Sequence, residues 1–176
     1  TIYIVGIRSC APLASFLAFY LHMIFPDVRQ VQTNSSSEIF EQMIRITEDD
    51  VVIGISFPRY SMRTMKALEF ANSRKAKVIT ITDSVHSPMN VYAACTLIAK
   101  SDMASIVDSL VAPLSVINAL VVALCMKRQA DVKKTLESME KLWDEYQVYS
   151  NDEINRLDDA RPMGGKKAAL PVKEKA

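Results

Sequence analysis

The sequence contains few side chains that bind metal ions or form disulfides, with two histidines and three cysteines in 176 residues. His22 and His86 form no motif such as H-x-x-x-H. Cys10, Cys95 and Cys125 lie far apart, without the paired spacing of a zinc site or a disulfide framework. We therefore predict no metal, no cofactor and no disulfide. Unpaired cysteines are also typical of a reducing compartment, so we expect a cytoplasmic location.

The chain also lacks a surplus of either charge, because 21 basic residues stand against 20 acidic ones and the net charge is +1. Domains that bind nucleic acids usually present an excess of lysine and arginine, so the composition gives no electrostatic case for direct DNA or RNA binding. No charged leader with a small-residue cleavage site is recognisable, and we expect no secretory signal. The direct partner is expected to be a small molecule or a protein.

The longest uncharged stretch, Ser109 to Met126, approaches the length of a membrane-spanning helix. Pro113, Ser115 and Asn118 interrupt it, Asp108 adjoins it, and aromatic residues are missing at both ends. We therefore predict a helix buried in the core or in an oligomer interface, and no membrane partner.

Short β-rich apolar runs alternate with longer helical patterns along the chain, which predicts an α/β fold. We expect a three-layer αβα sandwich with a five-stranded parallel sheet, plus a C-terminal helix. The predicted strands are Ile2–Gly6, Val28–Val31, Val51–Ile55, Val78–Thr82 and Thr96–Ala99. The predicted helices are Cys10–Ile24, Glu38–Thr47, Met62–Arg74, Ile106–Arg128 and Val132–Tyr149.

Polar residues follow three of the predicted strands, in the segments Gly6–Cys10, Ser56–Ser61 and Thr82–Ser84. Open α/β sheets bind ligands beyond the carboxyl ends of their strands, which lie on one rim of the sheet. Hydroxyl groups and an arginine before a helix are typical of anion binding. The sequence therefore predicts an anion site on this rim.

The stretches Ile53–Thr64, Ala76–Ser84 and Asp108–Leu120 resemble the sugar isomerase (SIS) domain of RpiR/MurR-type bacterial transcriptional regulators, and the resemblance extends from Ile2 to Arg128. It implies a doubly wound domain that binds phosphorylated sugars and signals to an N-terminal helix-turn-helix domain. We expect residues 1–128 to form this domain, 129–150 a C-terminal helix and 151–176 a flexible tail. DNA would be contacted only through an N-terminal domain missing from this chain, whether removed or never present.

Phosphosugar-binding SIS domains commonly carry Ser-x-Ser-Gly-x-Thr after the third strand, and this chain matches the pattern in part. Ser56 falls on the first serine and Ser61 on the threonine, while Pro58 and Arg59 replace the second serine and the glycine. The resemblance implies that Ser56 and Ser61 contact the ligand, although turn formation and helix capping also explain them. Proline removes an amide donor, and the Arg59 guanidinium is expected to bind phosphate in its place.

The first strand end departs from the Gly-x-Gly-x-Ser of many such domains, because Arg8 and Cys10 replace the second glycine and the serine. Ser9 is a ligand candidate with helix capping as its alternative, and Cys10 is one with a small buried residue as its alternative. The sequence leaves open whether Arg8 and Arg59 both face the pocket and share one anion, or whether only one of them does.

Thr64, one turn into the following helix, and Asp83 and Ser84, after the fourth strand, complete the ligand candidates. We assign no catalytic residue, because His86 is the only histidine near the rim and a solvated loop position explains it. The sequence therefore favours a phosphorylated sugar effector that is bound without turnover. The alternatives are a phosphosugar isomerase on the same fold and a domain that serves only to dimerise its parent protein.

The predicted C-terminal helix places Val132, Leu136, Met139 and Trp143 on one apolar stripe. Packing on its own domain and packing against a partner both explain this stripe. We expect self-association into a homodimer or tetramer through this helix and the apolar helix that precedes it.

Overall fold

The computed structural model describes residues 1–32, 36–102, 106 and 108–148. The chain divides into two compact units, of which the first is Thr1–Leu136 and the second begins at Glu137. All the strands and the cavity described below belong to the first unit. The tail predicted for residues 151–176 lies outside the described residues.

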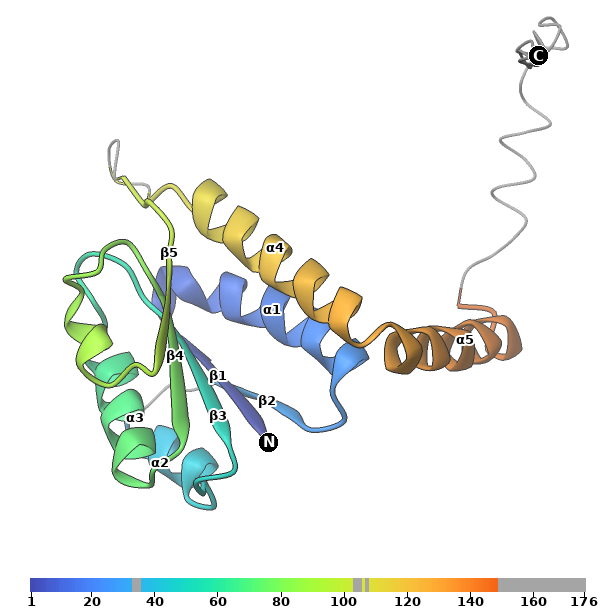
Figure 1. The fold of residues 1–176 in the computed structure, drawn as a ribbon, viewed down its shortest axis with the longest axis horizontal. Helices are drawn as coiled ribbons and strands as arrows, with labels where there is room; N and C mark the ends of the chain where they lie inside the picture. Colours follow the sequence, from blue (N-terminus) through green and yellow to red (C-terminus); the bar gives the residue numbers. More distant parts are fainter. Residues whose placement is uncertain (33–35, 103–105, 107, 149–176) are drawn as a thin grey trace, which may run out of the picture. The chain divides into compact units, whose positions relative to one another are not determined.

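The first unit is built on one parallel sheet, as the alternation of apolar runs predicted (Figure 1). Parallel strands covered on both faces favour continuous runs of branched apolar residues, which is the composition of β1 and β3, two of the three inner strands. The strands pair in the order β2-β1-β3-β4-β5. Their bounds are β1 Ile2–Gly6, β2 Val28–Val31, β3 Val51–Ile55, β4 Lys77–Thr82 and β5 Cys95–Ile98.

Helices cover both faces of the sheet and bury a separate apolar core on each side (Figure 1). On one face α1 (Ala11–Ile24) packs beside α4 (Val111–Lys127). On the other face lie α2 (Ser36–Met43), α3 (Met62–Ser73) and the short 3₁₀ helix η2 (Pro88–Val91). The three-layer αβα prediction is confirmed, and a C-terminal helix, α5 (Gln129–Glu145), is present.

Helix ends differ from the predictions more than strands do. The helix α4 begins at Val111 and not at Ile106, whose side chain is 92% exposed. Pro113 then lies in the first turn of α4, where a helix needs no N–H from that residue. The helix α2 ends at Met43, four residues before the predicted Thr47.

The apolar helix α4 packs against α1 and buries Pro113, Ile117 and Val121. Among the described residues, no single helix has both the length and the apolar character to cross a membrane. Taken together, α4 and α5 are long and apolar enough, but the pair is bent where the two helices meet.

Candidate functional site

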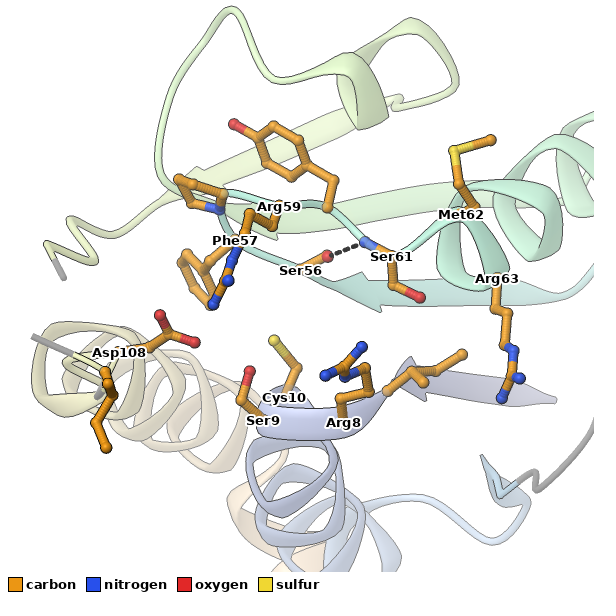
Figure 2. Close-up of a pocket in the computed structure, with 14 residues that line it drawn as sticks. Arg8, Ser9, Cys10, Ser56, Phe57, Arg59, Ser61, Met62, Arg63 and Asp108 are labelled. Carbon is orange, nitrogen blue, oxygen red and sulfur yellow. Dashed lines mark hydrogen bonds between the residues drawn. The ribbon is translucent and has the colours of Figure 1, made fainter.

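A cavity of about 640 Å³ lies at the carboxyl ends of β1 and β3 (Figure 2). These two strands pair directly, with Gly6 opposite Ile55, so the loops that follow them start side by side. The chain runs from β1 to β2 on one side and returns to β3 on the other, which makes this the switch point where α/β sheets bind ligands. The lining residues are Ile7, Arg8, Ser9, Cys10, Ser56, Phe57, Pro58, Arg59, Tyr60, Ser61, Met62, Arg63, Ile106 and Asp108.

The loop after β1 forms one wall of the cavity. It contains the 3₁₀ helix η1 (Arg8–Cys10), which leads directly into α1. A Cβ atom on Gly6 would lie 2.7 Å from the Cys10 carbonyl oxygen and 2.8 Å from the Ala14 Cβ, so this close turn requires glycine. Burial raises the pKa of the Cys10 thiol, with smaller opposing contributions from hydrogen bonds to the Phe57 backbone and Ser9. Cys10 therefore stays a thiol at neutral pH and is a poor nucleophile.

The loop after β3 forms the facing wall and is closed by its own two serines. The backbone N–H of Ser61 donates to Oγ of Ser56 over 3.1 Å, and Ser61 Oγ accepts a long hydrogen bond of 3.5 Å from the N–H of Thr64 at the start of α3. Both hydroxyls act as acceptors in these bonds. Each therefore keeps its O–H to donate, which is what an anion in the cavity requires.

Of the described residues that line the cavity, three are arginines and a single one, Asp108, is a carboxylate. Arg8 and Arg59 have positive φ angles of 58° and 62°, in the left-handed region that costs a non-glycine residue about 1 kcal/mol or more. Within the described part of the chain, Arg8, Arg59 and Arg63 form no ion pair. The cavity therefore offers several cationic groups to a ligand.

A hydrogen bond ties the loop after β3 to the end of β4. The Tyr60 hydroxyl donates to Oδ1 of Asp83 over 2.7 Å, and the Thr82 hydroxyl donates to the same oxygen over 3.2 Å. Burial, followed by the hydrogen bond to Asp83, raises the pKa of Tyr60. This contact holds the loop that carries Arg59 against the neighbouring strand.

The cavity brings together five of the eight ligand candidates, namely Ser9, Cys10, Ser56, Arg59 and Ser61, and it adds Arg8. The other three, Thr64, Asp83 and Ser84, do not line it.

Each of those three residues has different surroundings. Thr64 is fully buried beneath the first turn of α3, and its Oγ1 has no hydrogen-bond partner among the described residues. Asp83 accepts the bonds from Tyr60 and Thr82, and Ser84 Oγ accepts one from the backbone N–H of His86. His86 itself is exposed and does not line the cavity.

Several residues that line the cavity were not predicted from the sequence, above all Arg63 and Asp108. Arg63 follows directly on the predicted loop, so its place in the first turn of α3 was a usable signal. Asp108 reaches the cavity from the segment before α4, and only the folded chain brings it to the ends of β1 and β3. Among the described residues, no group of three or more His, Cys, Asp or Glu side chains is arranged to hold a metal ion.

Residues 1–123 match the family model of the SIS domain. A search of curated proteins found no match. Among solved structures, the sugar isomerase domain of the RpiR transcription factor from Sphaerobacter thermophilus is similar, with a TM-score of 0.75 and 24% identity over 80% of this chain and 78% of that one. The Vibrio vulnificus NanR protein complexed with ManNAc-6P gives a TM-score of 0.70 and 17% identity over 85% of this chain, which spans 56% of that protein's length.

A protein with an inferred isomerase function is also among the similar structures. A hypothetical protein from Methanococcus jannaschii, for which the molecular function of a 3-hexulose-6-phosphate isomerase was inferred, gives a TM-score of 0.59 and 13% identity over 76% of this chain and 75% of that one. These likenesses show a shared fold for regulators and isomerases.

Proposed function

This chain belongs to the SIS domain family, and from that premise we propose that its cavity binds a phosphorylated sugar as an effector, without turning it over. The observation that carries the proposal is the loop from Ser56 to Ser61 at the switch point of the sheet. It combines two serine hydroxyls with a guanidinium on one wall of a single cavity.

The chemistry of this loop suits a phosphate group. The Ser56 and Ser61 hydroxyls keep their protons for donation, and the first-turn N–H groups of a helix lack intrahelical acceptors. Arg59 supplies a planar donor fork that matches two phosphate oxygens. This fork replaces the amide donor that Pro58 cannot provide.

Two similar structures support the ligand class. The NanR protein is complexed with ManNAc-6P, and the function inferred for the Methanococcus jannaschii protein is that of a 3-hexulose-6-phosphate isomerase, so both are linked to a sugar phosphate. The cavity of about 640 Å³ is within the range of about 300 to 1,000 Å³ that is usual for small-molecule sites.

Binding without turnover is favoured by the side chains that line the cavity. Aldose–ketose isomerisation needs a base placed beside C1 and C2 of the sugar. Among the described residues that line the cavity, Asp108 is the one carboxylate and none is a histidine. A phosphosugar isomerase is the second candidate, and the position of Asp108 is the observation that favours it. In that case, the loss of aldose–ketose interconversion in Asp108→Asn would identify the base.

We further propose that the domain acts within a cytoplasmic transcriptional regulator that contacts DNA through a separate N-terminal domain, as the similarity to RpiR and NanR suggests. Self-association would use α4, on which Val111, Val122 and Met126 are 74%, 57% and 66% exposed. A dimeric or tetrameric mass by light scattering that falls to the monomer in Val122→Glu is the expected result. A monomeric mass of the unmodified chain at micromolar concentration would contradict self-association.

The effector proposal is tested by a thermal-shift screen of hexose, pentose and amino-sugar phosphates, with the unphosphorylated sugars and inorganic phosphate as controls. A ligand at a hundredfold excess over Kd stabilises the folded state by about 2.7 kcal/mol, which is readily detected. We expect a shift with at least one sugar phosphate, no shift with its unphosphorylated parent, and loss of the shift in Ser56→Ala and Ser61→Ala. No shift with any compound would contradict the proposal.

A further inference from the structure

We propose that the ligand is a sugar phosphate that carries a second anionic group, and that Arg8, at the end of β1, binds this second group. The inference rests on the proposed function, because it assigns the phosphate to the loop from Ser56 to Ser61.

The cationic groups of the cavity outnumber those that one phosphate needs. A phosphomonoester carries a charge of about −1.5 to −2 at neutral pH, and one guanidinium fork with hydroxyl and amide donors is a complete set of partners for it. Arg59 and the serines of its loop form such a set. Arg8 and Arg63 remain, and within the described part of the chain neither is neutralised by an ion pair.

The arginines stand on two different walls (Figure 2). Arg59 extends from the loop after β3, and the guanidinium of Arg8 extends from the facing wall, beside Ser9 and Cys10, into the space between them. Arg63 lies at one end of this space, in the first turn of α3. A ligand that spans the cavity therefore meets a cation at each wall.

The backbone at Arg8 has a conformation that a glycine substitution would preserve. Its φ of 58° is one that glycine adopts freely and an L-residue rarely does. Arg8 and Arg59 share this conformation, and both present their guanidinium groups to the cavity.

The shared chemistry of the second group is a planar or tetrahedral oxyanion that accepts the two parallel N–H bonds of a guanidinium. A carboxylate, as in a phosphorylated sugar acid, and a second phosphate, as in a sugar bisphosphate, both have it. Asp108 lies at the end of the cavity opposite Arg63, beside Ser9, and disfavours a second anion at that end.

Isothermal titration calorimetry with matched pairs of ligands tests the inference. One pair is glucose 6-phosphate and 6-phosphogluconate, and the other is fructose 6-phosphate and fructose 1,6-bisphosphate. We expect the member with two anionic groups to bind at least about tenfold tighter in one or both pairs, the gain of one charge-assisted contact. An advantage confined to the first pair identifies a carboxylate, and one confined to the second identifies a phosphate.

The variant Arg8→Gly is expected to abolish this advantage, reducing the ratio of the two affinities to less than about threefold. Glycine fits the φ of residue 8, so the variant retains its fold, which its melting temperature verifies. Lys75→Gly is the matched control, because Lys75 also has a positive φ, of 64°, and does not line the cavity. In this control variant, the ligand with two anionic groups is expected to keep its full gain in affinity over its partner.

Equal affinities within both ligand pairs would overturn the inference. So would tighter binding of the ligand with two anionic groups that persists in Arg8→Gly. If single phosphates bind and the second anion adds nothing, the proposed function stands and this inference alone fails. If no sugar phosphate binds, both fail.

Discussion

The backbone N–H of Ser61 donates a hydrogen bond of 3.1 Å to Oγ of Ser56 and so closes the loop between β3 and α3. Ser56 is 3% exposed, and its own N–H donates to the carbonyl of Ile81 in β4 over 3.2 Å. The loop is thus fixed at both ends before a ligand arrives. A preorganised loop loses little conformational entropy on binding, which favours affinity for a small anion.

Replacing Ser56 with alanine removes the acceptor for the Ser61 N–H and one donor for the ligand. We expect the free energy of unfolding to fall by about 1 kcal/mol and sugar-phosphate affinity to fall by about tenfold or more. Urea denaturation and calorimetry measure the two effects. Ser115→Ala, on the exposed side of α4, is the control; it removes only the 2.9 Å bond from the Ser115 hydroxyl to the Val111 carbonyl and should leave sugar-phosphate affinity unchanged. Unchanged affinity in Ser56→Ala would remove Ser56 from the site.

Replacing Arg59 with glycine separates the backbone from the side chain, because the φ of 62° suits glycine. Relief of strain and the added flexibility of the unfolded chain oppose each other, so stability should change by less than about 1 kcal/mol. Loss of the guanidinium fork should weaken sugar-phosphate binding by about tenfold or more. Lys75→Gly provides the backbone control, and equal affinities for the two variants would contradict a role for Arg59.

The pKa of Tyr60 is raised above its usual 10.0 by burial and then by the hydrogen bond to Asp83. The unfolded chain therefore releases the Tyr60 proton at a lower pH than the folded chain does. This difference in pKa stabilises the folded state. The stabilisation is fully present below about pH 10 and is lost as the pH rises through the pKa of Tyr60 in the folded chain.

Tyr60→Phe should lower stability by about 1 kcal/mol at neutral pH, through loss of the bond to Asp83. It should also weaken the decline in stability above about pH 10. Urea denaturation of both proteins from neutral to alkaline pH measures the difference. Burial also raises the pKa of Tyr3, but Tyr3 is present in both proteins, so its effect on stability cancels in the comparison. Parallel stability curves for the two proteins would show that Tyr60 does not titrate differently on folding.

Glycine at position 6 is required by the close approach of the η1 backbone, and Gly6→Ala tests this. We expect a loss of about 1 to 3 kcal/mol of stability, because the Cys10 carbonyl and α1 must move. Displacement of the Arg8–Cys10 wall should also lower ligand affinity. Gly54→Ala is the comparison, because its Cβ would meet the side-chain end of Leu68 at 2.8 Å and not backbone. If Gly54→Ala proved the more destabilising, the explanation for Gly6 would be wrong.

The sequence predicted the strands closely, since β1 and β3 are short branched apolar runs that end at polar residues, and such runs are recognisable without tertiary information. The start of α4 was missed because apolar residues stand on both sides of Asp108 and Ser109, so composition alone does not mark where the helix begins. The first turn of this helix is defined by Pro113 and by packing on α1, and neither effect is visible in hydrophobic periodicity.

The site was predictable where it depends on the ends of adjacent strands, as for Ser56, Ser61 and Ser9. Thr64 could have been placed in the core, because it shares one face of α3 with Ala67, Leu68 and Ala71. The surroundings of Asp83 and Asp108 in the folded chain were not predictable from local patterns. The bond from Tyr60 to Asp83 and the approach of Asp108 to the cavity join segments far apart in the sequence.

The phosphate is located by titrating the ¹⁵N-labelled chain with a binding sugar phosphate and with its unphosphorylated parent. We predict that the phosphate group adds large amide shift changes at Ser56, Arg59 and Ser61, and that inorganic phosphate reproduces part of them. Phosphate-dependent changes that leave these three amides unmoved, or that centre on Asp83 and Ser84, would contradict this prediction.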